Sequence, residues 1–312
     1  MPRLSPPRFE HTVLPASNEI WHTMFLRIRH FTRYDYAVSV SFAPHALYLR
    51  PRESSRQKLH EFSLEVTPSA RLIATTDPLD NALDWAFFAG GPASRLEFHS
   101  ELMVETLDTN PFDFFLKPSA LTFPFAYDYS ERAGLAPCLQ PRADSPPLPQ
   151  FRAWLDRWLP APPTDTVAFL SALNSAVHAS LAYTRRDEEG IQSATETLAR
   201  GNGSCRDYAV FLIELCRAQG LAARFVSGYL FEPPQPGTGA GHSPAMHAWV
   251  EIYLPGAGWR GLDPTRGIFC DDSFVPVAHA AVAESVNPVQ GSFFGASGIT
   301  SQLTTSLSIA RL

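Results

Sequence analysis

The chain has 312 residues, of which 45% are hydrophobic and 18% are charged, so it can bury a core and is not a mainly disordered chain. Its net charge of −6 disfavours binding to nucleic acid. No apolar run approaches the ~18 residues that span a bilayer, and the first residues lack the layout of a secretion signal. The 4 cysteines include no C-x-x-C pair. We expect a cytoplasmic protein that binds neither nucleic acid nor membrane; the composition leaves the oligomeric state open.

The first part of the chain is predicted to be rich in β-strands. Residues 1–23 have no sustained periodicity, and we expect a disordered extension there. Apolar and polar residues then alternate in three segments, 26–36, 60–66 and 96–105, with His60 on the apolar side of the second. Alternation with period two is typical of half-buried antiparallel strands. Residues 24–135 are therefore predicted to form a β-rich domain of the sandwich type.

The second part is predicted to be a mixed domain. Residues 136–164 contain 8 prolines and an aromatic segment, which indicates a linker with a short helix. Residues 165–312 follow as the core. Apolar spacing and capping signals predict helices first and antiparallel strands afterwards, an α+β arrangement. The expected helices cover residues 165–181, 193–201 and 205–219, and the expected strands cover 223–230, 246–254, 259–262 and a tail strand near 303–309.

Cys205 is the first candidate for chemistry because it opens a predicted helix. A thiol there lies at the positive end of the helix dipole with peptide N–H groups directed at it, and both favour the reactive thiolate. The glycines before it leave room for a substrate, and the Cys205 backbone N–H can face a developing oxyanion. Taken alone, a cysteine at a helix start is more often a small buried hydrophobe.

His247 and Asp263 supply the groups that a thiolate nucleophile needs. His247 begins a strand on the side opposite its aliphatic residues, and Asp263 closes the next strand just before Pro264. If the two strands form a hairpin, the Asp263 carboxylate returns beside His247 and can accept its Nδ1–H. Each residue also has a simpler interpretation. His247 can be a strand histidine whose hydrogen bonds are satisfied within the fold, and Asp263 can be the start of a turn.

Three motifs together resemble the transglutaminase-like superfamily, a branch of the papain-type Cys-His-Asp enzymes. They are Gly-Ser-Cys205-Arg-Asp, His247-Ala-Trp-Val-Glu and Gly-Trp-Arg-Gly-Leu-Asp263-Pro-Thr. The segments 27–36 and 49–52 resemble the β-domain that precedes this core in bacterial members. The resemblance implies a papain-like transglutaminase core, with helices packed on an antiparallel sheet, behind an N-terminal antiparallel β-sandwich-like domain.

The resemblance also implies the chemistry of the site. Cys205 would be the nucleophile, His247 the general base and acid, and Asp263 its orienting group, acting on a peptide or protein amide through a thioester. The sequence contains no segment that resembles an acidic calcium-binding loop, so we expect no metal and no cofactor. The second oxyanion donor is unassigned; Tyr183 is a candidate, and Trp249 either lines the cleft or packs. The charged residues 185–190 are expected to flank the cleft.

Other residues receive simpler interpretations. Cys216 lies on the buried stripe of its helix, Cys138 and Cys270 are placed in loops, and Arg206 either shapes charge preference or is solvated. His242 and His247 are too isolated to form a metal site. The glycines at 237, 239 and 241 are interpreted as a flexible linker or lid rather than a nucleotide loop.

Three functions compete on this evidence. The favoured one is a cysteine hydrolase or acyltransferase that acts on amide, peptide or isopeptide bonds, with hydrolysis preferred because water needs no second binding site. The alternative is a non-catalytic scaffold or binding protein with a vestigial core, which the complete set of three motifs disfavours. Acetyl transfer to an arylamine is a remoter possibility, and the N-terminal β-domain argues against it.

Overall fold

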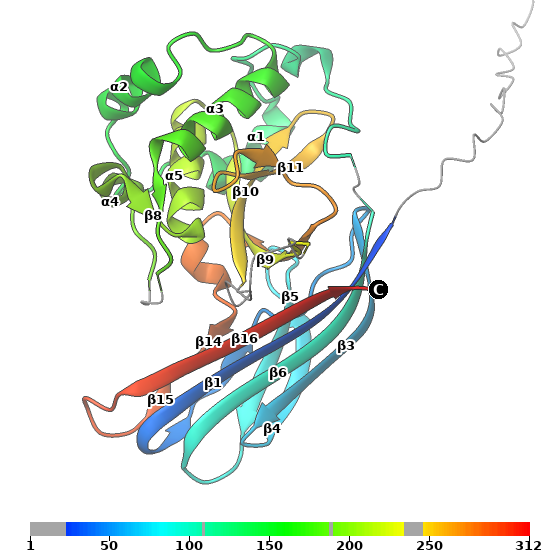
Figure 1. Cartoon of the computed structure of the whole chain (residues 1–312), viewed down its shortest axis with the longest axis vertical. Coiled ribbons are helices and arrows are strands. Elements are labelled where there is room, and N and C mark those ends of the chain that lie inside the picture. The colour runs from blue at the N-terminus through cyan, green and yellow to red at the C-terminus, as the bar shows by residue number, and fades with distance from the viewer. Residues whose placement is uncertain (1–22, 108–109, 187–189, 234–245) are drawn as a thin grey trace, which may run out of the picture.

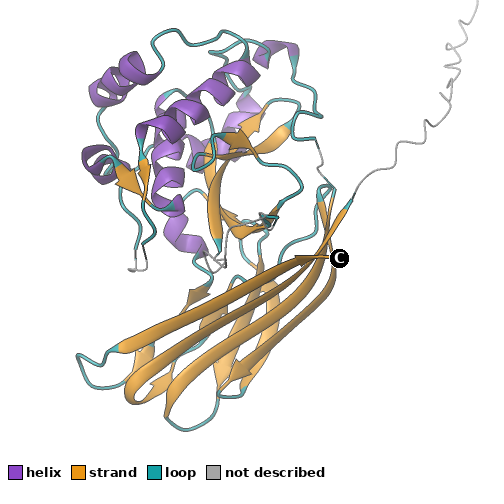
Figure 2. Ribbon diagram, in the orientation of Figure 1, coloured by secondary structure: helices purple, strands orange, loops and turns teal. Residues whose placement is uncertain are grey.

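The computed structural model describes residues 23–107, 110–186, 190–233 and 246–312, and most of the expected N-terminal extension lies outside these ranges. Within them the chain forms a β-domain and a mixed core that lies against one side of it (Figures 1 and 2). The predicted fold class is confirmed: an antiparallel β-domain is followed by helices packed on an antiparallel sheet. Among the described residues, no helix is long and apolar enough to cross a bilayer.

The β-domain is a sandwich of two antiparallel sheets. The first sheet has β1 at its centre and consists of β1 (Met24–Phe42), β3 (Gln57–Thr67), β6 (Ala93–Thr106), β15 (Phe293–Phe294) and β16 (Ser301–Arg311). The second consists of β2 (His45–Leu47), β4 (Ala70–Thr76), β5 (Ala82–Phe88) and β14 (Val289–Gln290). Apolar side chains from both sheets meet in one cluster, which includes Phe42, Leu47, Ala86 and Phe98. This shared cluster holds the sheets face to face.

The predicted alternation is present along β1 but fails at one point in β3. In β1 the apolar Leu26 and Ile28 are fully buried, whereas Arg29 is exposed. In β3 the pairing with β6 shifts register between Leu59 and Glu61, so that His60 is exposed instead of lying on the apolar side. A β-bulge adds one residue to a strand, and period-two counting across it assigns the wrong face.

The core consists of five α-helices around a five-stranded antiparallel sheet, counted over the described residues. The helices are α1 (Tyr129–Leu139), α2 (Leu148–Trp158), α3 (Thr166–Ser180), α4 (Ala194–Arg200) and α5 (Cys205–Ala218). The sheet order is β12 (Ile268–Phe269), β11 (Gly258–Asp263), β10 (His247–Leu254), β9 (Ala223–Leu230) and β13 (Phe274–Ala280). Short elements complete it: η1 (Pro118–Ala120), β7 (Ala182–Tyr183), β8 (Asn202–Gly203) and η2 (Ala283–Val286).

Helix α5 is the buried centre of the core. Its residues from Asp207 to Arg217 are all buried, and it packs against the aliphatic face of β10, which carries Ala248, Val250 and Ile252. The helix ends before Gly220, whose φ of +78° suits a residue without a side chain. Because α5 is fixed on every side, its first residue, Cys205, is held in a defined position.

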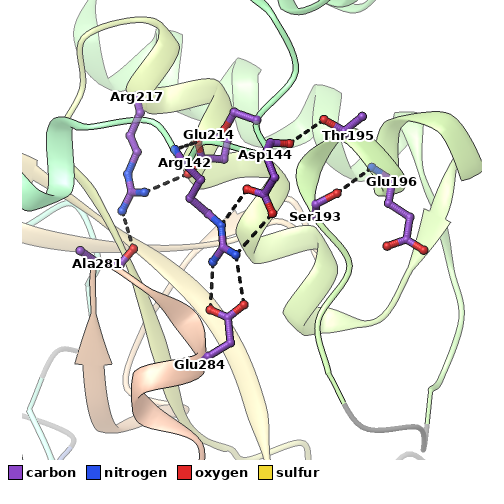
Figure 3. A network of polar contacts seen from close by, with 10 residues as sticks. Arg142, Asp144, Ser193, Thr195, Glu196, Glu214, Arg217, Ala281 and Glu284 are labelled. Atoms are coloured by element: carbon purple, nitrogen blue, oxygen red, sulfur yellow. Dashed lines mark hydrogen bonds and ion pairs between the residues drawn. The ribbon is translucent and has the colours of Figure 1, made fainter.

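A buried ion pair ties α5 to the segments around it (Figure 3). Arg217 Nη1 donates to Glu214 Oε1 at 2.9 Å, with both side chains almost completely buried. Glu214 Oε2 also accepts from the Arg142 backbone N–H, and Arg217 Nη2 donates to the Ala281 carbonyl. The Arg142 guanidinium in turn forms two bonds to Glu284 in η2. This network therefore joins α5, the loop before α2 and the chain that leaves the core.

The β-domain and the core share a hydrophobic cluster. It contains Leu26 and Leu307 from the first sheet together with Tyr229 of β9, Phe231 just after β9 and Val275 of β13. The Tyr229 hydroxyl is also hydrogen bonded to His30 Nδ1 at 3.2 Å. The β-domain thus covers part of the sheet face that α5 leaves uncovered, along β9 and β13.

The structure differs from the predicted boundaries in two places. The tail strand was expected in the core, but β16 pairs with β1 along eleven residue positions of the β-domain. Its alternating pattern identifies a strand without specifying the partner, which lies almost a whole chain length away. All residues from 24 to 135 were assigned to the β-domain. In this segment the last strand, β6, ends at Thr106, and α1 packs on the core through Leu135. Cys138 accordingly lies in α1, where a loop was expected.

Candidate active site

Cys205 is the first residue of α5 and is separated from β8 only by Ser204, the N-cap residue. The two-residue strand β8 pairs with β7 in parallel, and this pairing aligns Tyr183 with Gly203. The Cys205 side chain is only partly buried, in contrast to the helix behind it. As the first helical residue, its backbone N–H has no acceptor within the helix and remains available for a bound oxygen.

Asp207 fixes the turn that presents Cys205. Its fully buried carboxylate accepts hydrogen bonds from the backbone N–H and the hydroxyl of Ser204, each at 2.8 Å. It also accepts from Arg186 Nη1 at 2.8 Å and from the Gln192 N–H at 2.7 Å. A side chain at Gly203 would place its Cβ 2.6 Å from the Asp207 Cβ, so only glycine fits there. One carboxylate therefore joins the helix start to the loop that follows Tyr183.

His247 is the first residue of β10 and lies opposite Gly228 of β9. A Cβ at Gly228 would lie 2.2 Å from the Val275 carbonyl oxygen, so glycine allows β9 and β13 to approach closely. The His247 ring stacks on Trp249, with ring centres 6.2 Å apart, and Trp249 packs edge-on against Phe274. These aromatic side chains restrict the orientation of the imidazole.

Asp263 ends β11 and reaches His247 across the hairpin. The pairing of Val250 with Leu262 places Asp263 diagonally from His247 on the same face of the sheet. His247 Nε2 lies 2.8 Å from Asp263 Oδ2, and the other carboxylate oxygen accepts from the N–H and the hydroxyl of Thr265 at 2.8 and 2.7 Å. Asn174 holds the turn by donating to the Asp263 carbonyl. The carboxylate is fully buried and held at both oxygens.

The sequence-based expectation about the histidine nitrogens is corrected by this geometry. Nδ1 was expected to face the carboxylate, but Nε2 does so. Nδ1 therefore lies on the ring edge away from the carboxylate, and Cys205 is the other side chain that interacts with this imidazole. A hairpin predicts that the two residues meet but not which edge of the ring faces the carboxylate, since that depends on the side-chain rotamer.

The electrostatics favour a protonated His247. Burial alone lowers the pKa of His247, but hydrogen bonds and charge interactions with Asp263 and Cys205 raise it to about 10. Burial raises the pKa of Asp263, and the bonds and charge of His247 together with the Thr265 bonds hold it below its ordinary value. The carboxylate is thus negative and the imidazole positive at neutral pH, which is the environment that stabilises a thiolate.

The remaining candidates fall into different environments. Tyr183 is 59% exposed, and burial followed by the charge of Cys205 raises its pKa, which places its hydroxyl in the field of the thiol. Arg185 lowers the pKa of the same hydroxyl, whereas residues 187–189 of the expected charged loop lie outside the described residues. Trp249, in contrast, is 1% exposed and stacks on the His247 ring, so it packs in the interior and does not line an open cleft.

The other cysteines and the glycine-rich segment add little to the site. Cys216 is fully buried in the core, as expected, and Cys270 follows β12 in a loop. Arg206 donates to the Arg186 carbonyl and so braces the neighbouring loop. The glycines at 237, 239 and 241 and His242 lie outside the described residues. In the described ranges, no group of three His, Cys, Asp or Glu side chains is arranged to hold a metal ion.

Sequence reasoning missed the supporting residues. Asp207 stands in the quoted Gly-Ser-Cys-Arg-Asp motif, but its spacing from Cys205 gave no sign of the four groups that it binds. An aspartate inside the first turn of a helix is usually explained by the helix dipole. Thr265, two residues after Asp263, could have been noticed because a hydroxyl at that spacing often bonds an aspartate side chain in a turn.

Two family models match the chain. A model of the transglutaminase-like superfamily matches residues 155–264, and a model of the bacterial transglutaminase-like N-terminal region matches residues 26–105. The chain belongs to the transglutaminase-like superfamily. The matched core ends one residue after Asp263, and so it contains the three residues that the structure brings together.

Relatives of this transglutaminase-like protein include uncharacterised proteins of Mycobacterium tuberculosis and Mycobacterium leprae. The first is 27% identical over 276 residues, which cover 85% of this chain and 86% of the relative. The second is 24% identical over 277 residues, which cover 86% of this chain and 93% of the relative. A protein-glutamine gamma-glutamyltransferase of Pseudomonas aeruginosa is 39% identical over 69 residues, only 20% of this chain and 10% of that protein.

One solved structure resembles nearly the whole chain. It is a candidate cysteine protease from Cytophaga hutchinsonii, with a TM-score of 0.70 and 20% identity, covering 93% of this chain and 91% of the other. At this identity the likeness concerns the fold, which therefore includes both the β-domain and the core.

Proposed function

We propose that this protein is a cysteine hydrolase or acyltransferase that acts on amide, peptide or isopeptide bonds through a thioester on Cys205. The observation that carries the proposal is the 2.8 Å contact of His247 with the fully buried Asp263, in an imidazole whose pKa is raised by its interactions with both Asp263 and Cys205. Family membership supports the general class of cysteine-based acyl chemistry. Hydrolysis is our preferred outcome, because water needs no second binding site.

In the proposed reaction the Cys205 thiolate attacks the amide carbonyl carbon and forms a C–S bond. The Cys205 backbone N–H, with Tyr183 as a second candidate donor, faces the oxyanion. The oxyanion collapses, the C–N bond breaks and the His247 imidazolium gives its proton to the leaving amine. Water then attacks the thioester, His247 takes a proton from it, and the C–S bond breaks to release the acid. Asp263 stabilises the imidazolium during both steps.

The test combines a substrate screen with detection of the intermediate. Purified protein is incubated with dipeptides, isopeptides and glutamine donors, with and without an added amine, and Cys205 is examined by mass spectrometry. We expect an acyl adduct on Cys205 that disappears as free acid forms, and no turnover by Cys205→Ser. Accumulation of the amine conjugate in place of the acid would overturn the preference for hydrolysis.

Reactivity of the thiol tests the enzyme class independently of the substrate. Iodoacetamide should alkylate Cys205 faster than the partly buried Cys138 at neutral pH, since Cys205 interacts with the protonated His247. Equal rates for the two cysteines would leave the scaffold alternative as the better explanation.

A further inference from the structure

The outer edge of β16 presents unpaired backbone groups. Leu312 N donates to the Phe25 carbonyl, and Ala37 N donates to the Thr300 carbonyl, so these positions are hydrogen-bonded pairs of the ladder. Such pairs alternate along an antiparallel ladder. The even-numbered residues of β16 therefore bond to β1, and the odd-numbered residues direct their N–H and C=O groups outward. No strand among the described residues pairs with that edge.

This edge lacks the devices that usually prevent pairing with another chain. From Ser301 to Ala310 it contains neither a charged residue nor a proline. The opposite edge of the same sheet, β3, is equally long at 11 residues and carries Lys58, Glu61 and Glu65. Charges on an edge strand oppose strand addition. Charged residues thus disfavour strand addition at the β3 edge of the sheet, whereas the β16 edge can accept another strand.

The strand that bears the open edge is linked to the candidate active site through side chains of the shared cluster. Leu307 of β16 is the register partner of His30, whose ring is hydrogen bonded to Tyr229. Tyr229 directly follows Gly228, the partner of His247. Met246, next to His247, packs in the same cluster as Leu307. In Figure 1, β16 runs along the side of the β-domain that faces the core.

We propose that the outer edge of β16 binds an extended segment of the substrate as an added strand, so that the substrate class is unfolded or extended polypeptide. This rests on the proposed function, because it assigns the acyl donor of the same site. Strand addition uses main-chain hydrogen bonds, which give affinity for an extended chain with little dependence on its sequence. A polypeptide held on β16 is tethered to the molecule that carries His247, so its amide groups are presented to the site at high local concentration.

Substitution at Thr305 tests this edge with a matched control. Thr305→Pro removes an outward N–H without breaking a bond to β1, whereas Thr305→Val keeps the N–H and the branched Cβ. In a Cys205→Ala background, fluorescence anisotropy measures binding of labelled, reduced and carboxamidomethylated ribonuclease A, an unfolded chain. We expect binding at least tenfold weaker with Thr305→Pro and within twofold of the parent with Thr305→Val. Circular dichroism shows that both variants are folded.

The outcomes separate this inference from the proposed function. With Cys205 present, Thr305→Pro should raise KM for the unfolded chain and leave both dipeptide turnover and iodoacetamide alkylation unchanged. Equal binding by Thr305→Pro and Thr305→Val overturns the edge as the binding site, whatever Cys205 does. Sedimentation showing a dimer that only Thr305→Pro dissociates would assign the edge to a second copy and also overturn it. Failure of alkylation, with binding retained, counts against the proposed chemistry alone.

Discussion

Protonation of a single side chain, His247, connects the site to the stability of the fold. Its pKa of about 10 lies above the ordinary value of ~6.5, because Asp263 and Cys205 favour the charged form. This stabilisation is fully present below pH ~6.5 and is lost as the pH rises through about 10. Urea unfolding of wild type and His247→Gln should give a difference in unfolding free energy that declines by at least ~1.4 kcal/mol, one pKa unit, from pH 7 to pH 10.5. A constant difference would contradict a charged His247.

The same residue is expected to control the reactivity of Cys205. His247→Ala removes the cation beside the thiol, so the alkylation profile should move to higher pH and amide turnover should fall by ~10²–10⁴-fold. Stopped-flow alkylation across pH 5–10 measures the shift. His178→Ala, on α3, serves as a control histidine outside the contact and should leave the profile in place.

Arg186 is expected to act on Cys205 through Asp207. Arg186→Met leaves the fully buried Asp207 carboxylate without its cation in the first turn of α5. The uncompensated negative charge opposes a thiolate at the same helix start, so alkylation should again require higher pH. Arg200→Met, which breaks an exposed pair with Glu196, is the control. If alkylation changes only in amplitude and not in pH dependence, Arg186 has a purely structural role.

At the scale of elements, the Glu214–Arg217 pair decides how firmly α5 is held. Both side chains are nearly inaccessible, so Glu214→Ala leaves a buried guanidinium without a partner and should cost ~3–5 kcal/mol of unfolding free energy. The exposed Glu196→Ala should change it by less than ~1 kcal/mol. The double variant Glu214→Met with Arg217→Met should recover most of the loss, as measured by urea denaturation. No recovery would show that the bonds from Arg142 and Ala281 matter more than the pair.

Local sequence patterns predicted the elements of the core well. The expected strand at 223–230 coincides with β9, and the helices around Cys205 and after Asp165 end within one residue of their predicted limits. The meeting of His247 with Asp263 followed from hairpin geometry alone. The patterns contain no information about distant partners or about rotamers. The bulge at His60 depends on the pairing with β6, and the position of β16 depends on its pairing with β1. The edge of the His247 ring that faces Asp263 depends on the side-chain rotamer. Asp207 is a similar case, because its partner Arg186 comes from a separate loop.

For the whole molecule, the shared cluster predicts cooperative unfolding of the β-domain and the core. Leu307, 6% exposed, packs with residues of β9 and β13, and Leu307→Ala should cost ~2–5 kcal/mol. Tryptophan fluorescence and far-UV circular dichroism should report one coincident transition that moves as a unit. Leu303, on the same strand but 49% exposed, provides the control, with a loss of less than ~1 kcal/mol for Leu303→Ala. Separate transitions in the variant would show that the two parts fold independently.

The pairing of β1 with β16 also constrains the order of events during synthesis. The first strand of the β-domain leaves the ribosome long before the last, and the entire core is made in between. Until β16 emerges, one edge of β1 has no permanent neighbour, which exposes the nascent chain to wrong pairing and to chaperones that recognise bare edges. Maturation of the thiol site is therefore expected to await the synthesis of β16, so that a chain cut short before β16 carries Cys205 but lacks a strand that supports the core.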